Sequence, residues 1–233
     1  MSENIPTTSA TNTSTHTEHY AYWVRLAAIT SSSVALILVV IKFYAWLVSD
    51  SSAMLASTTD SILDLFASIM NIVILRFALA PADDEHKFGH GKAESLAGLV
   101  QAAFVLGSAI LLIFNGVERV INPRIIVQSN IAIGVTIVAI MLTLLLVVFQ
   151  RYVIKRTGSI VISADALHYQ SDLFLNLGVL AAIFLSQGVW LQADGAFTIA
   201  VALYLLFGAG QIIYQSVYQL MDHELSEDEL AQI

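Results

Sequence analysis

The stretch AMLASTTDSILDLFASIMN, residues 53–71, places two carboxylates, Asp60 and Asp64, inside an apolar segment long enough to cross a bilayer. A second apolar segment, SADALHYQSDLFLNLG, carries His168 and Asp172 at the same four-residue spacing. Four residues make about one helical turn, so the members of each pair project from one helix face. An ionisable group at bilayer depth costs about 2.5–3.5 kcal/mol even on the insertion scale. Three carboxylates and one imidazole, offered by two helices, therefore predict a four-ligand site for a divalent metal ion.

A simpler explanation of one membrane carboxylate is a hydrogen bond to a hydroxyl group of a neighbouring helix, and hydroxyl residues surround Asp60 in the sequence. Two matched pairs at helical spacing argue against that explanation. Asp165 differs, because it follows Ser163 and Ala164 near the start of its segment. We expect Asp165 to be a helix cap or first-turn acid, and we leave it out of the predicted site.

The composition predicts a membrane protein before any motif is considered. Hydrophobic residues make up 57% of the chain and charged residues 12%, where an ordinary soluble domain has about 25% charged residues. A net charge of −8 does not suggest nucleic acid or anionic lipid as a partner. The chain has no cysteine, which excludes disulfides and leaves only carboxylate and imidazole as metal ligands.

Six apolar segments, each of at least the roughly 20 residues that a membrane helix needs, are separated by turn signals. Their expected limits are 24–48, 53–80, 93–121, 130–154, 159–187 and 194–220. An all-α membrane fold follows, because a transmembrane barrel would show short alternating segments instead. We expect a disordered tail over 1–22, a six-helix transport domain over 23–222, and the start of a further domain over 223–233.

The basic residues predict the orientation. With both termini on one side, most basic residues fall on that side: Arg25, Arg76, Lys87, Lys92, Arg151, Lys155 and Arg156. Arg119 and Arg124 flank the opposite loops, and Lys42 is expected to extend toward that face. The positive-inside rule then places both termini in the cytoplasm.

A second cluster of metal-binding side chains lies in the loop PADDEHKFGHGKAE after the second segment. Asp83, His86 and His90 could bind a metal there, with glycines allowing a tight path. The alternative is a solvated acidic turn that carries incidental histidines.

DSILD, PADDEHKFGHGKAE and ADALHYQSD together resemble the cation diffusion facilitator family, in particular its bacterial YiiP (FieF) branch, from about Trp23 to the last residue. The resemblance implies a homodimeric, six-helix metal/proton antiporter of the inner membrane that exports zinc and related ions such as cadmium and ferrous iron. It assigns the transport site to Asp60, Asp64, His168 and Asp172.

The resemblance also implies a loop site at Asp83, His86 and His90, and a charge pair between Lys92 and Asp222. Members of this branch continue into a cytoplasmic ferredoxin-like domain, which we expect to be absent from this chain. The chain is then a piece of a longer protein or a naturally short member of the family.

Two other classes of function remain to be weighed. An intramembrane zinc-dependent enzyme would also place histidine and carboxylates in helices, but the chain lacks HExxH. A passive metal channel must release its ions fast, whereas four convergent ligands favour tight binding and alternating access. The ligand set suits zinc and also tolerates cadmium, iron or manganese.

Small residues on the third segment indicate how two chains could associate. Gly98 with Ala102, and Ala103 with Gly107 beside Ser108, are spaced by one turn, which lets helices approach closely in lipid. Such residues also serve packing within a single chain, and the sequence does not decide between the two uses.

Overall fold

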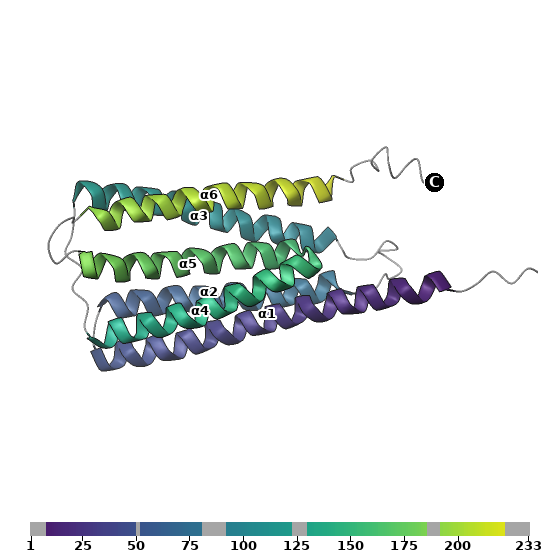
Figure 1. Cartoon of the computed structure of the whole chain (residues 1–233), viewed down its shortest axis with the longest axis horizontal. Helices are drawn as coiled ribbons and strands as arrows, with labels where there is room; N and C mark the ends of the chain where they lie inside the picture. Colours follow the sequence, from purple (N-terminus) through teal and green to yellow (C-terminus); the bar gives the residue numbers. More distant parts are fainter. Residues whose placement is uncertain (1–7, 50–51, 81–91, 123–129, 186–191, 222–233) are drawn as a thin grey trace, which may run out of the picture.

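The computed structural model describes residues 8–49, 52–80, 92–122, 130–185 and 192–221, and this part of the chain is helical apart from short helix ends. The helices are α1 (Thr8–Ser49), α2 (Ser52–Ala78), α3 (Lys92–Ile121), α4 (Asn130–Thr157), α5 (Ile160–Leu185) and α6 (Ala193–Leu220). They run side by side as one bundle, and the start of α1 and the end of α6 lie at the same end of it (Figure 1). The predicted all-α, six-helix fold is confirmed.

Within the described residues, α1, α2, α3, α4 and α6 are long and apolar enough to cross a membrane. α5 carries Asp165, His168 and Asp172, and it lies in the middle of the bundle in contact with each of the other five helices (Figure 1). A helix enclosed by its neighbours does not have to present an apolar surface to lipid. The enclosure therefore lets α5 carry these three ionisable side chains within the bundle.

α1 is longer than the expected first segment. We expected disorder over residues 1–22, but the helix begins at Thr8, and residues 1–7 lie outside the described part. Residues 8–49 contain no proline or glycine, so the membrane-spanning helix can extend toward the N-terminus without a break. Tyr20 also anchors this extension, because its hydroxyl donates a hydrogen bond of 2.6 Å to Glu94 of α3.

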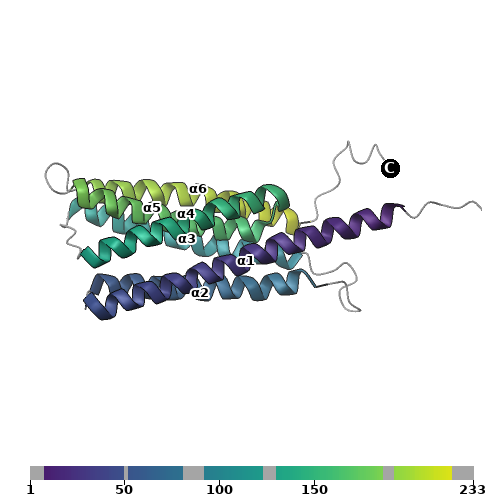
Figure 2. The same cartoon turned by 60° about the horizontal axis from the view of Figure 1, so that its bottom comes forward.

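Two helix pairs have the most extensive contacts, α3 with α6 and α1 with α2; Figure 2 shows α1 and α2 along one side of the bundle. The backbones of α3 and α6 approach closely where two glycines meet. A Cβ atom on Gly195 would lie 2.7 Å from the carbonyl oxygen of Gly116. Large side chains such as Phe66, Phe104 and Phe207 remain exposed on the outside, as a lipid-facing surface requires.

The turn between α4 and α5 fixes where α5 begins. Gly158 adopts a left-handed φ of 66° and its N–H bonds the carbonyl of Ile154 at 2.8 Å, which ends α4. Ser159 then caps α5, since its hydroxyl accepts a hydrogen bond of 3.3 Å from the N–H of Ile162. The same hydroxyl donates to Glu94 at 2.5 Å. α5 is thus held in register against α3 before it enters the bundle.

Candidate metal centre

Three of the four predicted transport ligands meet where α2 and α5 contact each other. Nε2 of His168 lies 2.9 Å from Oδ1 of Asp64 and 3.7 Å from Oδ2 of Asp172. One ligand atom from each of the three residues lies within 4.8 Å of the others. The side chains are 18% exposed for Asp64, 29% for His168 and 30% for Asp172, so the group is half-buried and an ion can still reach it.

The separations fit a small tetrahedral ion. Zinc binds carboxylate oxygen and imidazole nitrogen at about 2.0–2.1 Å, which puts neighbouring ligand atoms of a tetrahedron about 3.3 Å apart. The distances of 2.9 Å and 3.7 Å from His168 to its two carboxylates bracket that value. Three protein ligands of this kind leave a fourth position, which another carboxylate or a water molecule could occupy.

Asp60 does not join this group in the structure. It is exposed and lies one turn before Asp64, which displaces it by about 6 Å along the axis of α2. Lys42 was expected to extend toward the far face, but it is half-buried. Its ammonium donates a hydrogen bond of 2.8 Å to the hydroxyl of Ser61, the residue after Asp60. A buried hydroxyl acceptor within reach accounts for this orientation.

The role of Asp165 was not predicted from the sequence. We expected an N-terminal cap, but Ser159 caps α5 and Asp165 is only 3% exposed, in the interior of the bundle. Its carboxylate accepts four hydrogen bonds, two on each oxygen. The donors come from four different helices: Ser31 of α1 at 2.7 Å, Asn71 of α2 at 3.1 Å, Gln101 of α3 at 3.2 Å and Gln150 of α4 at 2.7 Å.

A tyrosine extends this buried network toward the candidate metal site. The hydroxyl of Tyr169 lies 2.9 Å from that of Ser68, and the hydroxyls of Ser68 and Ser31 are 3.3 Å apart. Tyr169 is the neighbour of His168 and contacts its ring edge-on, with ring centroids 5.6 Å apart. The imidazole is therefore supported by a polar layer that ties α5 to α1 and α2.

A signal for this network was present in the sequence. Asn71, Gln101 and Gln150 are amides inside long, largely apolar segments, and a polar group at membrane depth needs a partner. Nothing in the linear order shows that all three turn toward one carboxylate, because that depends on how four helices are rotated.

Four of the remaining predicted site residues cannot be placed. Asp83, His86, His90 and Asp222 lie outside the described residues. Lys92 is described and is the exposed first residue of α3. The loop site and the charge pair remain predictions.

The bundle and its cluster of ligands define a multi-pass helical membrane protein that carries metal-binding side chains on its membrane helices. Residues 28–221 match the family described as the cation efflux transmembrane domain, and the chain belongs to this cation efflux family, in its FieF branch. It is similar to proteins named cation-efflux pump FieF. The protein from Shewanella oneidensis is 49% identical over 214 residues, which cover 92% of this chain and 72% of that protein. Those from Yersinia pestis and Yersinia pseudotuberculosis are 44% identical, over 92% of this chain and 71% of each relative.

Membership of this family decides one of the open alternatives. The relatives are named as efflux pumps, which are transporters, and the family is one of transmembrane cation-efflux proteins. The chain is accordingly a transporter and not an intramembrane zinc enzyme.

Proposed function

We propose that this chain exports divalent transition-metal ions from the cytoplasm in exchange for protons. Zinc is the main cargo, and cadmium, ferrous iron and manganese are further candidates that the same ligand set accepts. The observation that carries the proposal is the meeting of Asp64, His168 and Asp172, whose ligand atoms lie within 4.8 Å of one another. The names of the relatives support efflux as the direction of transport.

The proposed transport site has four ligands, with Asp60 as the fourth. In the structure Asp60 lies apart from the other three. A rotation of α2, or a change in the Asp60 side chain, would bring it to the open position as the ion binds. Such a change of ligand number between states gives the site a way to hold and then release its ion, which alternating access requires.

Exchange with protons follows from the ligand chemistry. Carboxylate and neutral imidazole are the forms that bind metal, so an ion displaces whatever protons the empty site holds. Release of the ion on the far side would allow protons to rebind and return.

The proposed location is the inner membrane, with both termini in the cytoplasm. The start of α1 and the end of α6 lie at one end of the bundle (Figure 1). The last turns of α2 and α4, which end there, carry Arg76, Lys155 and Arg156. By the positive-inside rule that end faces the cytoplasm. A homodimer and a peripheral loop site at Asp83, His86 and His90 complete the proposal.

The test is a metal panel in reconstituted vesicles, with metal flux and internal pH recorded together. We expect zinc uptake into inverted vesicles, with proton movement in the opposite direction. A metal flux that carries no protons and does not saturate would instead indicate a passive channel.

A further inference from the structure

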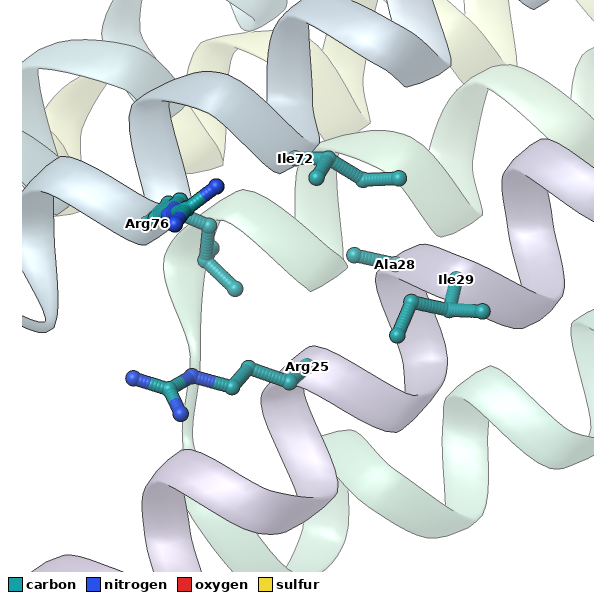
Figure 3. Close-up of a pocket in the computed structure, with 6 residues that line it drawn as sticks. Arg25, Ala28, Ile29, Ile72 and Arg76 are labelled. Atoms are coloured by element: carbon teal, nitrogen blue, oxygen red, sulfur yellow. The ribbon is translucent and has the colours of Figure 1, made fainter.

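A groove between α1 and α2 lies outside the candidate metal centre. A cavity of about 400 Å³ is lined by Arg25, Ala28 and Ile29 of α1 and by Ile72, Leu75 and Arg76 of α2. Figure 3 shows both arginines on one side of it, with Ala28, Ile29 and Ile72 along the other. The cavity is therefore amphipathic, with two cationic groups beside an apolar wall.

The two arginines lie at one depth in the membrane. Arg25 lies 24 residues before Ser49, the end of α1, and Arg76 lies 24 residues after Ser52, the start of α2. At about 1.5 Å per residue each arginine is about 36 Å from the turn that joins the two helices. The hydrocarbon layer is about 30 Å thick, so both guanidinium groups reach the layer of lipid headgroups.

Within the described part of the chain, neither guanidinium has a hydrogen bond or an ion pair. The other arginines at this end have protein partners. Arg151 donates to Gln170 at 2.8 Å, and Arg156 stacks on the rings of Tyr152 and Trp23. Among the described residues at this end, Arg25 and Arg76 are thus the arginines with no hydrogen bond, ion pair or ring contact, and a guanidinium matches phosphate geometry better than any other side chain.

The groove continues along α1. A second cavity of about 450 Å³ shares Arg25 and Ile29 and is further lined by Tyr22, Leu26, Leu79, Ala21 and Glu18. Ile29 is 54% exposed and Tyr22 60% exposed. Residues 18–22 of α1 lie on the headgroup side of Arg25, so the second cavity widens the space around the cationic end, whereas an acyl chain would follow Ala28, Ile29 and Ile72 on the bilayer side.

We propose that this groove binds one anionic phospholipid of the leaflet at the basic end, with its phosphate between Arg25 and Arg76 and an acyl chain against Ile29 and Ile72. The net charge of −8 gave no indication of such a partner. That argument concerns the whole chain, whereas a headgroup responds to charges within a Debye length, about 8 Å at physiological salt. Basic pockets between membrane helices are a recognised form of headgroup site.

The experiment is native mass spectrometry of the purified, delipidated chain in detergent. The protein is titrated with phosphatidylglycerol, phosphatidylcholine and phosphatidylethanolamine that carry the same acyl chains. We expect preferential retention of one phosphatidylglycerol. Arg25→Gln or Arg76→Gln should each weaken it about fivefold, because one basic residue near an anionic headgroup is removed.

Lys155→Gln is the matched control. It removes one positive charge at the same end of the bundle but outside the groove, and retention should be unchanged. An equal loss in this control would overturn the proposal in favour of bulk charge. The double variant Arg25→Lys, Arg76→Lys should keep most of the binding, which separates lost recognition from lost folding.

Three further outcomes would also overturn it. Equal retention of phosphatidylcholine would show an apolar groove without headgroup recognition. Preference for phosphatidylethanolamine would point to Glu18 as the group that selects the headgroup. Displacement by millimolar inorganic phosphate would identify a free-anion site. Because lipid retention is measured without flux, none of these outcomes bears on the proposed metal export.

Discussion

At the scale of single residues, the candidate site depends on Asp64. It is the one carboxylate of α2 that reaches the imidazole of His168, at 2.9 Å, and the contact joins two helices that are distant in sequence. Asp172 approaches the same nitrogen from one turn further along α5. An isolated carboxylate at this depth would be costly, and the three groups together form the binding set of a divalent ion.

The first prediction concerns these ligands. Asp64→Ala or Asp172→Ala should reduce zinc flux in proteoliposomes to background, because losing a direct ligand should cost more than the 10–100-fold in affinity typical of outer-shell changes. Asp60→Ala should weaken zinc binding less than Asp64→Ala, since Asp60 lies outside the group of three. Near-normal flux in Asp64→Ala, in a protein that inserts normally, would remove this residue from the mechanism.

The second prediction concerns Asp165. Asp165→Asn keeps the shape of the side chain but replaces one acceptor oxygen with a donor, which then faces hydroxyl or amide donors from two helices. Each buried group left without a partner costs about 1–3 kcal/mol. We expect a clear fall in melting temperature. Tryptophan fluorescence in detergent, recorded during heating, measures it.

Ser33→Ala provides the control for this variant, because Ser33 is exposed and bonds only its own helix at Ile29. It should leave the melting temperature nearly unchanged. If Asp165→Asn melts like Ser33→Ala, the four hydrogen bonds do not stabilise the bundle.

At the scale of helices, the sequence predicted well where α2 to α6 begin, but it did not predict how each helix is rotated about its axis in the bundle. α2 to α6 each begin within one residue of the expected position, because proline, glycine and charged turns interrupt long apolar runs. The pairing of Asp64 with His168 and Asp172 also followed, since one-turn spacing defines a face within a single helix. The Asp165 network did not follow, because α5 is enclosed on all sides and its sequence has no solvent face from which to set the rotation.

The small residues of α3 show the same limit. The structure assigns Gly98 and Ala102 to packing within the chain: both are buried, and a Cβ on Gly98 would collide with Ile160. Ala103, Gly107 and Ser108 are exposed, and nothing lies within 4 Å of a Cβ on Gly107. Half of the predicted contact surface is therefore used internally, and the outward half is available to a second copy.

The third prediction uses that outward half. Gly107→Leu should weaken the homodimer, because a bulky side chain prevents close approach of two α3 helices. Light scattering in detergent across a dilution series measures the shift toward monomer. Gly134→Leu on α4 is the matched control, since Gly134 is equally exposed and open. Identical behaviour of the two variants would exclude this face of α3 as the dimer contact.

At the scale of the whole molecule, the two ends of the bundle differ in the groups that they carry. The end that holds the start of α1 and the end of α6 carries Arg25 and Arg76, and the Asp165 network ties four helices to α5 inside it. The candidate metal centre lies beyond this network, on the next turn of α5. An ion that moves between the two ends must therefore pass a layer in which the helices are held together by hydrogen bonds.

The last prediction concerns the coupling of zinc binding to proton release. Zinc affinity should fall as pH falls, because metal requires Asp60, Asp64 and Asp172 as carboxylates and His168 as neutral imidazole, while protons compete for each of them. Calorimetry in buffers of different ionisation enthalpy should give a binding enthalpy that varies linearly with buffer, with a slope equal to the protons released. The measurement belongs in a His86→Ala, His90→Ala background, so that the loop does not contribute. Asp64→Asn in that background should abolish zinc binding and, with it, the slope. A zinc affinity that is independent of pH from mildly acidic to neutral conditions would contradict proton exchange. An ion that displaces no proton on binding cannot be driven outward by protons that return.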